Sequence, residues 1–155
     1  MGSNREIHAA ISGNNSIVLS LNSGSINYYT KAANGSYQVT QILTPPTSFM
    51  DVEICPNEEY IAVASSSNYL KLYQKTSGTF SFHSAESCSS GYPTQISFSH
   101  DCQWLVWACT NYDVKIFRNL PPFTSLQNLT NSDIVLKVAI STSTLLVSLN
   151  SIPIF

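Results

Sequence analysis

The chain has 155 residues and a formal net charge of -2, from seven Lys and Arg residues and nine Asp and Glu residues. A protein that binds nucleic acid by neutralising phosphates carries a basic face, so this charge argues against nucleic-acid partners. Charged residues make up 10% and hydrophobic residues 43% of the sequence, compared with about 25% charged residues in an average soluble domain. Such a composition excludes an intrinsically disordered chain.

Short runs of β-branched and aromatic residues follow one another along the chain, separated by clusters of Gly, Pro, Asn and Ser. This pattern predicts β-strands and gives no sign of an amphipathic helix, so we expect an all-β fold. In chain order, the expected strands are Ile7 to Ser12, Ile17 to Asn22, Ile26 to Lys31, Tyr37 to Leu43, Asp51 to Cys55, Tyr60 to Ser65, Tyr69 to Lys75, Phe80 to Ser84, Thr94 to Ser99, Trp104 to Thr110, Asp113 to Arg118, Ser125 to Leu129, Ile134 to Ile140, Leu145 to Leu149 and Ile152 to Phe155.

The strand pattern repeats at a spacing of 44 residues. This shift places Ile54 on Phe98, Tyr60 on Trp104, Ile61 on Leu105, Leu70 on Val114, Lys71 on Lys115, Leu72 on Ile116 and Tyr73 on Phe117. The first segment joins the series when one residue is removed from its first turn, and the last segment is a shortened copy. Units of about 44 residues with four antiparallel strands are typical of β-propeller blades. We expect one partial propeller domain over residues 1–155, with blades over 5–44, 48–88, 92–130 and, incomplete, 133–155.

Two stretches of the repeat carry a resemblance to a known family. Residues 50–64 and 95–108 each read as two strands joined by a polar turn, and Leu70 to Tyr73 and Val114 to Phe117 read as third strands. In these segments the chain resembles the WD-repeat β-propellers, over about three and three-quarter blades. The resemblance implies a non-catalytic scaffold for protein–protein interactions that needs no cofactor.

The sequence departs from the WD-repeat pattern at its polar positions. Where the family ends its third strand in Trp-Asp, this chain has Tyr29-Thr30, Tyr73-Gln74 and Phe117-Arg118, and no Gly-His opens a repeat. The usual turn aspartate is replaced by Ser23, Ser67 and Asn111. The hydrogen-bonded network of the family is therefore not expected here, and membership of a different propeller family is left open.

An incomplete fourth blade raises the question of how the ring is completed. Closed propellers usually hold 4 to 8 blades, and an open blade exposes unpaired backbone and apolar side chains. We expect a second copy, a strand-completing partner chain or a continuation of the same protein to cover it. Two copies would supply about eight blades, so we expect a homo-oligomer or a protein partner.

We find no constellation of catalytic residues in the sequence. His8, His83 and His100 lack metal-ligand spacing with one another, and the His100-Asp101-Cys102 cluster falls in a turn, as does Glu58-Glu59. No glycine-rich loop that could hold a phosphate is present. We therefore expect no enzyme, no catalytic residue, no cofactor and no metal site.

Propellers generally bind partners through the loops at one rim, where the fourth strand of a blade leads into the next blade. The aromatic residues on these loops and on the neighbouring turns are the expected protein-binding anchors: Phe49, Tyr69, Tyr92 and Tyr112. A competing interpretation is that they pack over the blade edges.

The cysteines and the N-terminus bear on the setting of the protein. Cys55, Cys88, Cys102 and Cys109 show no zinc-type spacing and are expected to be free thiols. Because residues 1–8 are polar and no apolar run is long enough to span a bilayer, we expect neither a signal peptide nor a membrane partner, and a cytoplasmic or otherwise intracellular location. One alternative is an extracellular lectin-like or glycan-bearing propeller, which the sequons at Asn14, Asn34 and Asn128 would suit. A propeller-based hydrolase is a weaker alternative.

Overall fold

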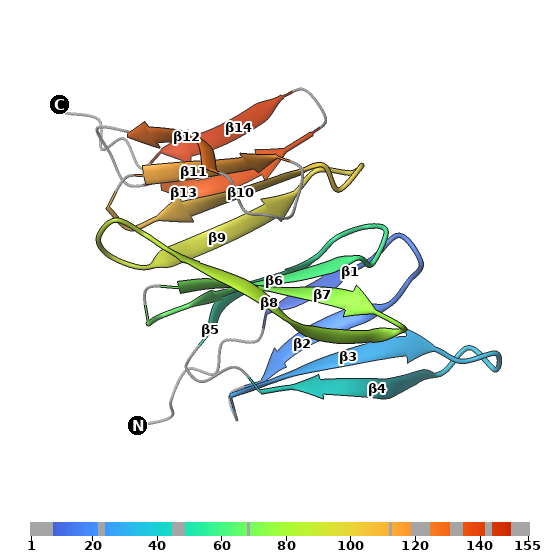
Figure 1. Ribbon diagram of the computed structural model, residues 1–155. Helices are drawn as coiled ribbons and strands as arrows, with labels where there is room; N and C mark the ends of the chain where they lie inside the picture. Colours follow the sequence, from blue (N-terminus) through green and yellow to red (C-terminus); the bar gives the residue numbers. More distant parts are fainter. Residues whose placement is uncertain are drawn as a thin grey trace, which may run out of the picture.

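The computed structural model describes residues 8–21, 24–44, 49–67, 69–111, 113–118, 125–130, 135–141 and 144–149. These residues form fourteen strands and no helix (Figure 1). The strands are β1 (Ala9–Ile11), β2 (Ile17–Leu21), β3 (Ser25–Lys31), β4 (Tyr37–Leu43), β5 (Phe49–Ile54), β6 (Tyr60–Ser65), β7 (Tyr69–Thr76), β8 (Thr79–Ser87), β9 (Pro93–Phe98), β10 (Trp104–Cys109), β11 (Asp113–Arg118), β12 (Ser125–Thr130), β13 (Val135–Ile140) and β14 (Leu145–Leu149). Among these residues no helix has the length and apolar character needed to cross a membrane.

The strands form four antiparallel sheets in chain order. The first sheet holds β1 to β4, the second β5 to β8 and the third β9 to β12, while β13 and β14 pair as the fourth. Within each sheet every strand pairs with the strand that follows it in sequence, which is the arrangement that short polar turns between strands favour. The all-β prediction and the grouping of strands by four are confirmed for the first three sheets. The expected strand Ile152 to Phe155 lies outside the described residues.

The four sheets stack face to face. The first strand of each sheet contacts the first strand of the next, so β1 meets β5, β5 meets β9 and β9 meets β13. In Figure 1 the first sheet lies at the bottom and the second above it, and the third and fourth sheets, which overlap in this view, lie at the top. The described strands do not close into a barrel or a ring.

The spacing of 44 residues recurs in the backbone. The pairing of third and fourth strands shifts register at Tyr28/Tyr29, at Leu72/Tyr73 and at Ile116/Phe117. Residues separated by one repeat therefore make the same β-bulge in three sheets, and a bulge of this kind bends and twists the outer part of a sheet. The first three sheets therefore bend at the same position, which helps them to stack on one another.

Apolar side chains fill the space between successive sheets. One cluster, which includes Ile26 and Ile54, joins the first and second sheets. A second, which includes Leu72 and Trp107, joins the second and third sheets, and a third joins Val106 to Val138 of the fourth sheet. We call the face of a sheet that points toward the next sheet in chain order its leading face, and the opposite face its trailing face.

Candidate functional site

The structure describes the side chains of two of the four predicted anchors, Tyr69 and Tyr92. Tyr69 is the first residue of β7 and is 47% exposed, and Tyr92 lies directly before β9 and is 40% exposed. Both stand at the edge of the stack where odd-numbered strands begin, on neighbouring sheets. Phe49 begins β5 at the same edge, but its side chain and the whole of Tyr112 lie outside the described residues.

The loop that carries Tyr92 is fixed to the third sheet. A disulfide joins Cys88 to Cys109 at the end of β10. The backbone amide of Tyr92 donates to Thr110 Oγ1 (3.1 Å), and the amide of Thr110 donates to the Tyr92 carbonyl oxygen (3.0 Å). Gly91 has a φ of 76° and leaves no space for a side chain, since a Cβ there would collide with Thr110 Oγ1. Tyr92 is therefore presented to solvent on a constrained loop.

Polar side chains beside this loop are held in a small triangle. Ser89 Oγ donates to Asp113 Oδ2 (2.6 Å), and Asn111 Nδ2 donates both to Ser89 Oγ (2.8 Å) and to Asp113 Oδ2 (2.7 Å). The triangle ties the loop to the β10–β11 turn. Tyr92 therefore presents an exposed aromatic ring on the same loop as Ser89 of this fixed hydrogen-bonding triangle, a combination suited to recognising a partner.

All four cysteines are paired, which corrects the expectation of free thiols. Cys55 pairs with Cys102 and Cys88 with Cys109, at Cα separations of 5.8 and 6.1 Å. Stacking brings together residues from neighbouring sheets that are remote in sequence. Disulfides persist in oxidising environments and are rare in the cytosol. The expected cytoplasmic or intracellular location is therefore wrong, and the two pairs indicate an oxidising, extracellular or secreted setting.

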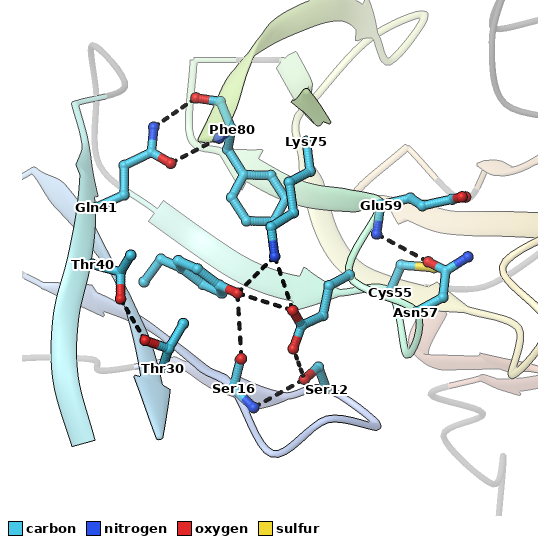
Figure 2. Close-up of polar contacts among 12 residues, drawn as sticks. Ser12, Ser16, Thr30, Thr40, Gln41, Cys55, Asn57, Glu59, Lys75 and Phe80 are labelled. Atoms are coloured by element: carbon cyan, nitrogen blue, oxygen red, sulfur yellow. Dashed lines mark hydrogen bonds and ion pairs between the residues drawn. The ribbon is translucent and has the colours of Figure 1, made fainter. Parts of the chain in front are cut away.

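A buried carboxylate joins the first and second sheets at their turns. Glu58 is 7% exposed, and its Oε1 accepts from Ser12 Oγ (2.6 Å) while its Oε2 accepts from the Tyr28 hydroxyl (3.0 Å) and from Lys75 Nζ (2.9 Å). Ser16 Oγ lies 3.3 Å from the same hydroxyl. Figure 2 shows Ser12, Ser16 and Lys75 pointing toward one another in this cluster.

The environment of Glu58 decides its charge. Burial acts to raise its pKa, but hydrogen bonds from Ser12, Ser16, Lys75 and Tyr28 outweigh burial and lower the pKa to about 2. The ammonium group of Lys75 also lies 5.1 Å from the Tyr28 ring centroid and 5.5 Å from that of Phe80. The Lys75–Glu58 ion pair lies within the second sheet, and hydrogen bonds to Ser12 and Tyr28 connect it to the first sheet. The paired carboxylate has no proton to donate at neutral pH.

The turn-to-turn links between sheets repeat. Ser12 and Cys55 begin equivalent turns, each donating its amide hydrogen back across its own turn at 2.9 Å. Glu58 and Cys102 occupy the same left-handed position of the turn in their sheets, with φ of 63° and 59°. The Ser12–Glu58 hydrogen bond thus joins the first and second sheets at the place where the Cys55–Cys102 disulfide joins the second and third. One link is polar and the other covalent.

This cluster is hard to predict from the sequence, because Glu58-Glu59 has the pattern of a solvated turn. The usable signal is the repeat itself. Cys55 and Cys102 lie 47 residues apart, and Ser12 and Glu58 lie 46 apart, so each pair is separated by one repeat plus the length of a turn. Comparing turn positions one repeat apart would have aligned both pairs.

A second polar link runs along the first strands of the sheets. Asp51 Oδ2 of β5 accepts from the Ile96 amide of β9 (2.9 Å), and Gln95 Oε1 of β9 accepts from the Val138 amide of β13 (3.2 Å). Asp51 and Gln95 are one repeat apart, so in two successive sheets the side chain at the same repeat position accepts a hydrogen bond from the backbone of the next sheet. His8 Nδ1 lies 3.6 Å from Asp51 Oδ1. These bonds fix the separation of the sheets along their first strands.

Glu53 lies two residues from Asp51 on the same face of β5 and is poorly solvated. Burial raises its pKa to about 7, and the charge of Asp51 adds to the effect. In the unfolded chain the pKa of Glu53 is near 4.5, so the folded protein holds the proton of this carboxyl more tightly. The carboxyl group therefore destabilises the fold increasingly as the pH rises from 4.5 to 7.

We therefore expect Glu53→Gln to raise the free energy of unfolding by about 2 kcal/mol at pH 8, after allowance for partial exposure. The gain should fade as the pH falls from 7 to 4.5. Urea unfolding at a series of pH values measures both features, with Glu59→Gln on the exposed turn as the control. A gain that is independent of pH would contradict this account of Glu53.

The clusters considered for catalysis do not assemble a reactive site. Asp101 accepts from Ser99 Oγ (2.6 Å) and from the Gln103 amide (3.1 Å), and these two bonds lower its pKa. Its carboxylate therefore closes the β9–β10 turn as an ordinary turn acceptor. Within the described part of the chain, no group of three His, Cys, Asp or Glu side chains could hold a metal ion.

Comparison with known proteins adds no family assignment. No protein-family model matches the sequence, and a search of curated proteins finds no match.

Proposed function

We propose that the chain is a non-catalytic protein-interaction module, built from β-propeller blades like those of WD-repeat proteins, that acts in an oxidising, extracellular or secreted setting. The repeated sheet supports the propeller part of this proposal: consecutive four-stranded meanders stack through their first strands, as blades of a propeller do. The two disulfides support the setting.

The observation that carries the binding role is the constrained rim. Tyr69 and Tyr92 expose 47% and 40% of their surface, and the Cys88–Cys109 disulfide fixes the loop that bears Tyr92. An aromatic side chain on a rigid loop loses little conformational entropy when it binds, which is a property of interface anchors. A partner protein that docks on this rim would cover both rings.

A lectin-like role is the second candidate, because the disulfides favour the extracellular setting in which it would operate. The exposed ring of Tyr92, on the loop that carries Ser89 of the triangle, offers a stacking surface beside polar groups. The sequon at Asn34 also lies in an exposed turn, where Asn34 Oδ1 accepts from Ser36 Oγ (2.7 Å). It is an accessible acceptor for a glycan.

The test compares binding by the wild type, by Tyr69→Ala/Tyr92→Ala and by Phe82→Ala, whose ring is 59% exposed on β8 away from the rim. Each is applied to an array of secreted and cell-surface proteins and to a glycan array. We expect a protein ligand that the double variant binds about 30-fold more weakly and that Phe82→Ala binds normally. Glycan binding with the same dependence would assign the lectin-like role instead. Equal binding by all three chains would refute the rim as the binding surface.

A further inference from the structure

Two faces at the ends of the stack are exposed although their counterparts inside the stack are buried. On the trailing face of the first sheet, Ile11 is 62% exposed, whereas its counterparts Ile54 and Phe98 in the second and third sheets are 2% and 6% exposed. Tyr37 on the same face is 40% exposed, and its counterpart Phe80 is 3% exposed. This face has the composition of an internal junction, and none of the described residues covers it.

Two further apolar side chains belong to this face. Val39 pairs with Tyr29 and Ile42 pairs with Asn27, and paired residues in a sheet project to the same side. Val39 is 46% and Ile42 59% exposed. Their counterparts in the second sheet, Phe82 and Ala85, are also exposed, so Ile11 and Tyr37 are the residues that indicate a missing neighbour. Val39 and Ile42 extend the apolar surface around them.

The leading face of the fourth sheet is exposed in the same way. Leu146 of β14 is 66% exposed, and the residues at its position in the first three sheets, Val18, Ala62 and Val106, are each fully buried. The strand register supports the correspondence. Leu146 pairs with Ala139, the residue before Ile140, and Val106 pairs with Ser97, the residue before Phe98.

We propose that these two faces dock on each other between two copies of the chain, head to tail, and close an eight-sheet ring. The proposal rests on the propeller architecture of the proposed function and names the partner that completes it. Within the chain every junction packs a leading face against a trailing face, and the two exposed ends are one of each kind. A head-to-tail contact repeated twice about a two-fold axis closes, and eight blades lie within the range of closed propellers.

The turn-to-turn link predicts which residues meet across the new junction. Ser141 begins the turn of the fourth sheet, with its amide donating across the turn (2.8 Å) as in the turns of Ser12 and Cys55. Asn15 occupies the left-handed position, with φ of 62°, that Glu58 and Cys102 occupy in the next two sheets. The ring therefore places Ser141 of one copy against Asn15 of the other.

Cross-linking tests this geometry. Asn15→Cys and Ser141→Cys chains are prepared separately, mixed and oxidised. We expect a covalent dimer in the mixture only, because a head-to-tail junction brings unlike positions together, whereas a junction of like faces would cross-link either variant with itself. Asn14→Cys mixed with Ser141→Cys is the matched control and should cross-link much less. No cross-link in the mixture, or equal cross-linking of the control, would overturn the proposed junction.

Light scattering over a dilution series supplies the second measurement. We expect a molar mass of twice 17.0 kDa for the wild type and for Phe82→Asp, and a monomer for Ile11→Asp and for Leu146→Asp. A wild-type monomer at every concentration, or a dimer that survives both end-face substitutions, would refute the ring. Tyr69→Ala/Tyr92→Ala should remain dimeric, because these residues lie outside the proposed junction. If the wild type is a monomer and still binds its ligand through Tyr69 and Tyr92, the ring is refuted but the proposed function is not.

Discussion

Replacing Cys55 and Cys102 with serine is expected to lower the free energy of unfolding by about 4 kcal/mol. The disulfide spans a sequence separation of 47 residues, and closing a loop of that length restricts the unfolded chain by about this amount. The disulfide also joins the turns of the second and third sheets to each other. At the equivalent place between the first and second sheets there is only the Ser12–Glu58 hydrogen bond. Urea unfolding in non-reducing buffer measures the loss.

The second disulfide is the internal comparison for this experiment. Cys88 and Cys109 are separated by 21 residues, so replacing both with serine should cost less, about 3 kcal/mol. A reducing agent should destabilise the wild type by more than it destabilises either double variant. A Cys55→Ser/Cys102→Ser protein as stable as the wild type would show that the link between these turns contributes nothing to the fold.

The second large effect is expected at the ionic cluster, where Lys75→Met should cost about 3 kcal/mol at pH 7. The substitution keeps the length of the side chain but removes the cation that lies 2.9 Å from Glu58 Oε2, and the Glu58 side chain is only 9% exposed. Breaking a buried pair by removing one partner is costly because the remaining charge stays desolvated. The pKa of Glu58 should rise in the variant.

The pH dependence of this cost follows from the low pKa of Glu58. A carboxyl group with a folded-state pKa near 2, compared with 4.5 in the unfolded chain, stabilises the fold above pH 4.5 and loses that contribution as the pH falls towards 2. The deficit of Lys75→Met should shrink over the same range. Lys31→Met is the matched control, because Lys31 is the exposed residue one repeat earlier, and it should change stability by less than about 0.5 kcal/mol. Equal effects of the two substitutions would contradict the stabilising role of the Lys75–Glu58 ion pair.

The strands and their repeat could be predicted because their signals are local or periodic. Alternation of apolar residues and the composition of the turns identify a strand such as Tyr60–Ser65 from a few neighbours. The spacing of 44 residues needs only the chain compared with itself, and it reappears as equivalent bulges at Tyr29, Tyr73 and Phe117. Repeating units that contact only their neighbours make such a comparison informative.

The cysteine pairs and the Glu58 cluster could not be read in the same way, because both depend on how one sheet lies on the next. Cys102 and Cys109 border a single strand and cannot reach each other, and this correct observation did not exclude partners on another sheet. Glu58 follows two turn-forming residues and looks solvated, yet stacking buries it beside Lys75. Contacts between sheets are set by packing, which composition and periodicity do not encode.

The most direct test of the stacked arrangement is peptide mapping of the non-reduced protein by mass spectrometry. Four cysteines allow three pairings, and only the stack described above gives Cys55–Cys102 together with Cys88–Cys109. The account predicts these two linked peptides and no thiol that an alkylating reagent can label before reduction. Free thiols at the four positions, or either of the other pairings, would contradict both the register of the sheets and the oxidising setting inferred from it.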